Sequence, residues 1–267
     1  MQFDAHVHSA VSPDSDMAPK DAISALRRKG LGVVFTEHVD YVTPECGKDN
    51  SAEDAPKEGA IDFVCDFESY PAAYRSLRAN DVLLGLEIGL SAAYLPLNTK
   101  TAAGDYDYIL GSVHFVDGVD IYQNASKADA DTFFSRYLTY AKEMVELCGF
   151  FDCLAHIDYP ARYNAQIKDR LKYENFPDEF DALFNSLAKR GLALEINTQQ
   201  LGDDLTVENM LKIYRRFAQL GGRYVTIGSD SHIINNLGRN HAAALTIADA
   251  AGLKTVYYKE RKKIACK

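Results

Sequence analysis

The stretch FDAHVHSAVSPDSD, residues 3–16, places two histidines, His6 and His8, at the end of a short apolar run near the start of the chain, and two aspartates, Asp14 and Asp16, follow them. In an extended strand, side chains two positions apart point to the same side, so His6 and His8 can bind one metal ion together. Of the two aspartates that follow, Asp16 is placed to cap a helix predicted over residues 17–28. Two histidines at this spacing are a weak signal alone, so their meaning depends on where the other candidate ligands lie.

The composition is that of a globular protein with a full core. The chain has 267 residues, of which 47% are hydrophobic and 25% are charged, and its formal net charge is −9. That charge argues against a nucleic-acid partner, because proteins that neutralise phosphates are usually basic. The apolar runs fall short of membrane-spanning length, and the five cysteines match no zinc-ribbon or CxxC spacing. We therefore expect a single domain over residues 1–267 that is cytoplasmic, has no nucleic-acid or membrane partner, and keeps its cysteines reduced; the oligomeric state stays open.

Short apolar runs alternate with stretches of helical periodicity along nearly the whole chain. Predicted strands lie at 3–7, 32–36, 82–86, 108–113, 153–155, 193–196 and 224–227, and the clearest helices at 17–28, 133–147, 180–189, 207–220 and 240–251. This order predicts an α/β fold with a parallel sheet, either a closed barrel or an open doubly wound sheet. The sequence lacks a GxGxxG fingerprint and a P-loop, which disfavours the open nucleotide-binding sheet. Residues 41–61 form a polar insertion that is typical of a functional loop, and the basic tail 259–267 is interpreted as a solvated terminus.

Six of the seven histidines fall at or just past the carboxyl end of a predicted strand. Those ends meet on one face of a parallel barrel or sheet, so residues distant in sequence converge there. Imidazole and carboxylate groups are ligands of zinc, manganese and iron, and a set of this size is too large for one tetrahedral ion. The pattern therefore predicts a centre of two or three metals with a bridging carboxylate, built from His6, His8, His38, Glu87, His114, His156, Asp230 and His232.

These residues lie in motifs that resemble the polymerase and histidinol phosphatase (PHP) family of metal-dependent phosphoesterases. The motifs are DAHVHS at 4–9, TEHVD at 36–40, LGLEIG at 84–89, GSVHF at 111–115, LAHIDYPARY at 154–163, LEINT at 194–198 and GSDSH at 228–232. Within the family, SPDS at 12–15, GSVHF and Arg162 make the chain most similar to the histidinol-phosphate phosphatases. The resemblance implies a distorted (β/α)7 TIM-like barrel and three divalent ions, drawn from zinc, manganese and iron. It also implies their ligands: His6, His8, Glu87 and Asp230 for the first, Glu87, His114 and His156 for the second, and Asp14, His38 and His232 for the third.

The implied activity is hydrolysis of a small phosphate monoester, with L-histidinol phosphate as the leading substrate, by metal-activated hydroxide attack at a trinuclear centre. Three divalent ions, three carboxylates and a hydroxide leave a site charge of about +2, which suits a dianionic phosphate. The catalytic set is Asp230, Glu87 and His232, with Asp230 a candidate proton relay. Arg162, Arg239 and His38 are the candidate contacts to the substrate, because guanidinium groups hold phosphate by paired hydrogen bonds. Glu37 and Asp40 are candidates to orient the ligands from behind, and His241 is interpreted as a helix residue.

Two other functions stay open. The chain could be a PHP phosphoesterase acting on a nucleotide or another small phosphate ester, or a metal-binding regulatory domain without turnover, which the intact ligand set disfavours. One departure bears on the substrate: similar histidinol-phosphate phosphatases place an arginine shortly after the sixth strand, whereas Thr198 is followed by QQLGDD. Either Arg239 or a lysine of the 41–61 loop substitutes for that arginine, or the substrate is a different ester.

Overall fold

A closed barrel of parallel strands forms the centre of the computed structural model, which describes residues 1–41 and 63–266. The seven predicted strands are all present in it, most of them a residue or more longer than expected. Neighbouring strands pair in chain order, and the barrel closes between its first and last strands, where the Asp230 amide donates to the His6 carbonyl at 2.8 Å. This arrangement confirms the distorted (β/α)7 fold. The barrel strands are β1 (Gln2–Val7), β2 (Leu31–Asp40), β4 (Val82–Gly89), β5 (Tyr108–Ser112), β8 (Cys153–Leu154), β9 (Ala193–Asn197) and β10 (Tyr224–Gly228).

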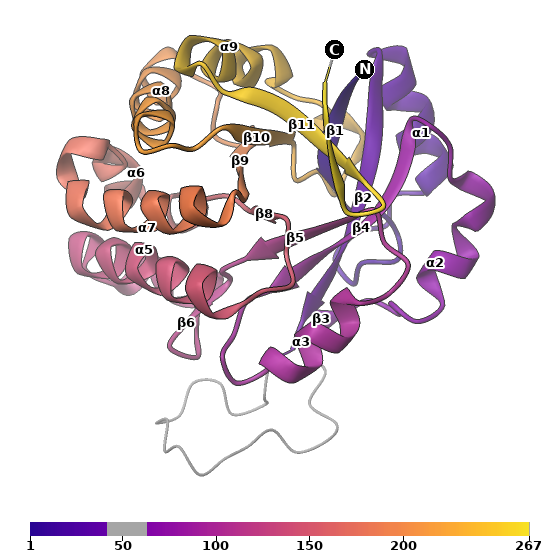
Figure 1. The fold of residues 1–267 in the computed structure, drawn as a ribbon, viewed down its shortest axis with the longest axis horizontal. Coiled ribbons are helices and arrows are strands. Elements are labelled where there is room, and N and C mark those ends of the chain that lie inside the picture. The colour runs from indigo at the N-terminus through magenta and orange to yellow at the C-terminus, as the bar shows by residue number, and fades with distance from the viewer. Residues whose placement is uncertain (42–62, 267) are drawn as a thin grey trace.

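Helices surround the barrel, with α5 to α9 gathered on one side and α1 and α2 on the other (Figure 1). Their apolar faces pack on the outer face of the strands and form the larger hydrophobic core. The long helices are α1 (Pro19–Arg28), α5 (Ala130–Leu147), α7 (Pro177–Arg190), α8 (Asp204–Gln219) and α9 (His241–Ala251), and the shorter ones are α2 (Tyr70–Ala73), α3 (Leu95–Ala102), α4 (Ile121–Asn124) and α6 (Ala165–Arg170).

The start of α1 differs from the expectation. The helix begins at Pro19, and the residue before it, Ala18, has an extended backbone and no capping side chain. Proline fits the first helical turn, where its missing N–H is not needed, and it holds the preceding residue extended. The prediction that Asp16 caps this helix is therefore wrong, and its carboxylate stands in the loop between β1 and α1. His241 is the first residue of α9, as expected for a helix residue.

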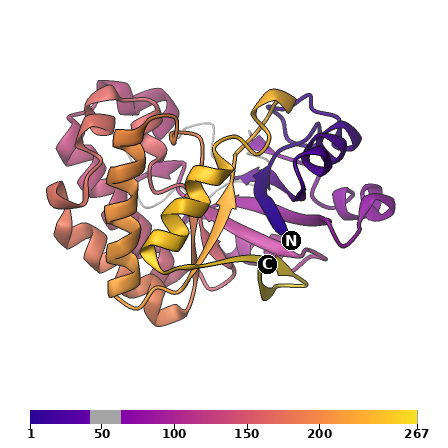
Figure 2. The ribbon, with the colours of Figure 1, turned by 90° about the horizontal axis from the view of Figure 1, so that it is seen from above.

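A hairpin at the end of the chain closes the barrel at the amino ends of the strands. It consists of β11 (Lys254–Lys259) and β12 (Lys262–Ala265), which pair antiparallel, and it lies beside the amino-terminal strand in Figure 2. The ring of Tyr258 stacks on Tyr108 with centroids 5.2 Å apart, and Arg261 binds Asp152 at 2.6 Å. The interpretation of this tail as a solvated terminus is wrong, because the hairpin covers the second, smaller core inside the barrel.

Three short strands lie outside the barrel. β3 (Phe63–Val64) pairs antiparallel with β2, and β6 (Phe115–Val116) pairs with β7 (Val119–Asp120). Of the predicted loop over residues 41–61, all but the first residue lies outside the described residues. Cys65, Cys148 and Cys153 are buried free thiols, as expected, while Cys266 is only partly buried and Cys46 is not described. In the described chain, no helix is long and apolar enough to cross a membrane.

Candidate metal centre

Glu87, at the carboxyl end of β4, stands at the centre of the predicted cluster and is fully buried. Its two carboxylate oxygens face different ring nitrogens. Oε1 lies 2.9 Å from Nε2 of His156 and 3.3 Å from Nε2 of His114. Oε2 lies 3.2 Å from Nε2 of His6 and 3.4 Å from Nε2 of His8. A carboxylate in this position can bridge two ions.

The first group of candidate ligands lies where the barrel closes, between β1 and the segment after β10. His6, His8, Glu87 and Asp230 each offer one ligand atom, all within 4.8 Å of one another. Asp230 presents Oδ1 at 3.4 Å from Nε2 of His6 and 3.3 Å from Nε2 of His8. His6 lies in β1 and His8 directly follows it, Glu87 lies in β4 and Asp230 in the loop after β10, as the convergence of strand ends predicts.

The remaining ligand atoms lie on either side of this group. Nε2 of His156 and Nε2 of His114 are 3.4 Å apart, and both face Glu87. On the other side, Asp14 lies 2.8 Å from Nε2 of His232 and 3.5 Å from Nε2 of His38. The structure also groups His8 with His38 and His232, and His38 with Glu87 and His114, so these groups of candidate ligands cut across the three sets that the resemblance implies.

The chemistry of these atoms fits divalent cations. Nδ1 of His6 lies 2.7 Å from Oε1 of Glu195, and a carboxylate only accepts, so Nε2 keeps its lone pair toward Glu87. Among the described residues, Nε2 of His6, Nε2 of His8 and Oε2 of Glu87 have no hydrogen-bond partner, and all three atoms are buried. A lone pair that faces a carboxylate oxygen at 3.2 Å is repelled unless a cation lies between them.

The pKa values of His6 and His8 reflect the charges of the groups around them. Burial opposes protonation of His6, but the carboxylates of Asp230, Glu195 and Glu87 raise its pKa well above the ordinary value. A metal ion would take the place of that proton. Burial lowers the pKa of His8 to about 3, helped by the neighbouring rings of His38 and His232, so His8 stays in the neutral form that binds metals.

Carboxylates behind the ligands fix the orientation of the rings. Asp40 lies 2.9 Å from Nδ1 of His114, which turns Nε2 of that ring toward Glu87. Glu37 accepts from the Ser12 hydroxyl at 2.6 Å, and that hydroxyl also lies 3.4 Å from Nδ1 of His8. Both carboxylates were expected in this supporting position, and buried partners of this kind raise the metal affinity of histidine ligands.

Two supporting residues were not assigned a role from the sequence. Glu195 in β9 contacts His6 through one oxygen and accepts from the His156 amide at 2.8 Å through the other. Asp4 accepts from the amides of Ser229 and Gly238, both at 2.8 Å. Asp4 precedes His6 by two positions in the same strand, so the alternation that paired His6 with His8 also indicated that Asp4 faces the site.

Two arginines border the cluster. Nη1 of Arg162 donates to Oδ2 of Asp230 at 2.6 Å, and its guanidinium lies 5.1 Å from the centre of the Tyr159 ring. Within the described residues, Nε and Nη2 of Arg162 and Nε of Arg239 are buried without a hydrogen-bond partner. Burial, followed by the nearby charge of Arg162, lowers the pKa of Arg239. Two cations with free donors at one edge of the cluster make a place where an anion is stabilised.

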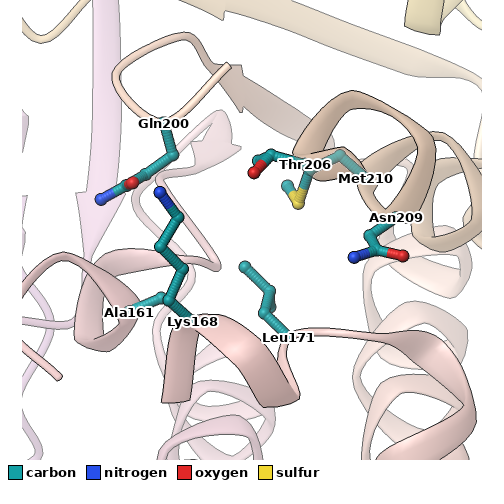
Figure 3. A pocket seen from close by; sticks show the side chains of 7 residues that line it. All are labelled: Ala161, Lys168, Leu171, Gln200, Thr206, Asn209 and Met210. Carbon is teal, nitrogen blue, oxygen red and sulfur yellow. The ribbon is translucent and has the colours of Figure 1, made fainter. Parts of the chain in front are cut away.

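The loop after β9 carries no arginine, as its sequence shows, and a small pocket separates it from α6 (Figure 3). Lys168 of α6 points across this pocket toward Gln200 of the loop. Thr206, Asn209 and Met210 of α8, with Leu171 and Ala161, form the rest of the lining. The lysines of the 41–61 loop that were considered as substitutes for the arginine lie outside the described residues.

Comparison with known proteins gives one consistent result. The PHP domain family model matches residues 4–199. The chain is 35% identical to a probable histidinol-phosphatase of Clostridium acetobutylicum, with 98% of both proteins covered. It is 26% identical to the histidinol-phosphatase of Lactococcus lactis, covering 94% of this chain and 91% of that protein. A crystal structure of Lactococcus lactis histidinol phosphate phosphatase complexed with zinc, L-histidinol and phosphate superposes with a TM-score of 0.85 at 23% identity, over 98% of each chain. With most of its length matched and its ligand geometry in place, the chain belongs to the PHP domain family.

Proposed function

We propose that this chain is a metal-dependent phosphatase that hydrolyses L-histidinol phosphate to L-histidinol and inorganic phosphate. The observation that carries the proposal is the two-sided environment of Glu87, which faces separate histidine sets, beside the free N–H groups of Arg162. The relative in Clostridium acetobutylicum, similar over 98% of both chains, supports this substrate over other esters.

The centre would hold three divalent ions, drawn from zinc, manganese and iron. The first would bind His6, His8, Glu87 and Asp230, the second Glu87, His114 and His156, and the third Asp14, His38 and His232. When bound, such ions polarise the phosphoryl oxygens and activate a water molecule for attack on phosphorus. Zinc in the Lactococcus lactis crystal structure makes zinc the first metal to test.

The protein side chains would hold the phosphate and the proton. Arg162 would bind the phosphate through Nε and Nη2, because its third nitrogen, Nη1, already donates to Asp230. Arg239 would add a second guanidinium in place of the arginine absent after β9, with His38 as a further contact. Arg162 donates to Oδ2 of Asp230 at 2.6 Å and would keep this carboxylate ionised beside the metal ions. Asp230 would be the proton relay for the attacking water, with Glu87 and His232 completing the catalytic set.

The proposal includes a small-molecule substrate, a cytoplasmic location and no nucleic-acid or membrane partner. The test is purification with metal analysis, followed by a phosphate-release screen with L-histidinol phosphate, sugar phosphates and nucleotides. We expect metal at close to three ions per chain and the highest kcat/KM for L-histidinol phosphate. A nucleotide or sugar phosphate preferred over L-histidinol phosphate would replace the substrate but keep the phosphatase. Absence of phosphate release from every ester by the metal-loaded protein would overturn the activity itself.

A further inference from the structure

An open groove lies beside the outermost ligands of the centre. It encloses about 650 Å³ of space that is open to solvent, and its wall includes the ligand candidates Asp14 and His232. The remaining lining residues come from two loops, one after β1 and one after β10: Asp16, Met17, Ile233, Ile234 and Asn235. A substrate whose phosphate lies on the cluster can therefore extend its organic part into this groove.

The groove is held in shape by hydrogen bonds between its two loops. The Ser15 hydroxyl lies 3.1 Å from the carbonyl of His232 and 3.2 Å from the carbonyl of His8. On the other wall, the Ser231 hydroxyl donates to the carbonyl of Ile233 at 2.7 Å. A wall fixed in this way is formed before any substrate arrives, which reduces the cost of ordering it on binding.

The groove combines one uncommitted carboxylate with exposed apolar side chains. Asp16 is exposed, does not cap α1, and forms no hydrogen bond or ion pair with another described residue. Ile233 and Ile234 expose 54% and 42% of their surface. Two adjacent exposed isoleucines directly after the ligand candidate His232 offer apolar surface on which an organic group can pack.

We infer that this groove is the subsite for the leaving group, and that it selects a leaving group that is both cationic and partly apolar. The inference rests on the proposed function. L-Histidinol carries an ammonium group and an imidazole ring, and the metal-loaded centre, with a charge of about +2, would repel that ammonium. Asp16 is placed to offset the repulsion, while Ile233 and Ile234 pack against the ring or its carbon chain.

The test compares two phosphate monoesters that differ only in the leaving group, which is cationic in L-histidinol phosphate and uncharged in glycerol phosphate. Asp16→Asn should lower kcat/KM for L-histidinol phosphate about tenfold, mainly through KM, because it removes a charge-assisted contact. Activity on glycerol phosphate should change less than about twofold, because the phosphate contacts are untouched. Asp21→Asn, which removes an exposed charge in the first turn of α1 outside the groove, is the matched control and should leave both substrates unaffected.

A second variant tests the apolar half of the subsite. Ile233→Ser should raise KM for L-histidinol phosphate severalfold while leaving metal content unchanged. An equal loss on both substrates, or an unchanged preference in Asp16→Asn and Ile233→Ser, would overturn the inference. The inference would also be overturned if Asp16→Asn and Ile233→Ser both kept the preference for L-histidinol phosphate while Tyr122→Ala lost it. Tyr122→Ala removes an exposed ring that packs on Tyr163. If the wild-type protein fails to prefer L-histidinol phosphate, the proposed function itself is wrong, and that result is read from the wild type alone.

Discussion

Replacing Glu195 with glutamine tests whether a residue that touches no substrate sets the metal affinity of the centre. Oε1 of Glu195 accepts from Nδ1 of His6 at 2.7 Å, and Oε2 accepts from the His156 amide at 2.8 Å. Oε2 also accepts from Nδ2 of Asn197 at 3.2 Å. Glutamine has the same shape but only one accepting oxygen, so its NH2 group must face either His6 or the two donors on the other side, the His156 amide and Asn197. If it faces those two, buried donors lose their acceptor. If it faces His6, that ring must protonate Nε2, which then points an N–H at the metal position.

Either outcome removes one charge-assisted hydrogen bond, which corresponds to roughly 1.5–3 kcal/mol. That free energy converts to a loss of about 10- to 150-fold in affinity for the first ion, in line with measured effects of such supporting carboxylates. Competition of zinc against a chelating dye, monitored for the apoprotein, measures the affinity directly. Glu208→Gln, an exposed glutamate on α8, is the matched control. Zinc affinity unchanged in Glu195→Gln, with the thermal midpoint also unchanged, would refute the claim that Glu195 fixes the His6 tautomer.

Four further outcomes follow from the same structure. Glu87→Ala should lower turnover by on the order of a thousandfold or more while the circular dichroism spectrum stays native, because the carboxylate between the two histidine sets is lost; retained turnover would contradict the assignment. Removing metal with a chelator should lower the thermal midpoint, since a ligand at about 1,000 times its Kd contributes roughly 4 kcal/mol, and readdition of zinc should restore it. Gly228→Ala should lower the free energy of unfolding by about 2 kcal/mol in a denaturant titration, because a Cβ there overlaps His6 and Glu195, whereas Gly149→Ala meets no atom within 4 Å and should be neutral. Tyr258→Ala should lower the free energy of unfolding by about 3 kcal/mol through lost packing on Tyr108 yet leave zinc affinity unchanged, which separates the two ends of the barrel.

The barrel strands could be predicted because each is a local pattern: a short apolar run followed by polar residues. All seven are confirmed, and so is the convergence of their carboxyl ends. The carboxy-terminal hairpin could not be recognised in the same way. In β11 the buried Val256 and Tyr258 alternate with the half-buried Thr255, Tyr257 and Lys259. The core partners of Val256 and Tyr258, namely Phe3, Leu83 and Tyr108, are distant in sequence. A strand that is stabilised by such non-local packing looks, locally, like a basic tail.

The candidate site shows the same division between local and non-local information. His6, His8 and Glu87 could be placed because ligand chemistry restricts the residue types at strand ends. The cap assigned to Asp16 was wrong although the sequence carried the deciding signal, because Pro19 marks the first turn of α1 and leaves Asp16 three residues outside it. The supporting role of Glu195 could not be predicted, because it depends on the contact with the ring of His6, which lies 189 positions away in the sequence.

Asp4 indicates that the closure of the barrel and the assembly of the site are one structural event. It precedes His6 in β1, yet its carboxylate binds the amides of Ser229 and Gly238, which flank the segment that carries Asp230 and His232. The same segment joins β1 through the bond from the Asp230 amide to the His6 carbonyl. A change that opened this junction would therefore separate His6 and His8 from Asp230, so the first metal group cannot form before the barrel has closed. For this reason the first and last motifs can form one tight site although nearly the whole chain separates them: the closed barrel brings the two ends of the chain side by side.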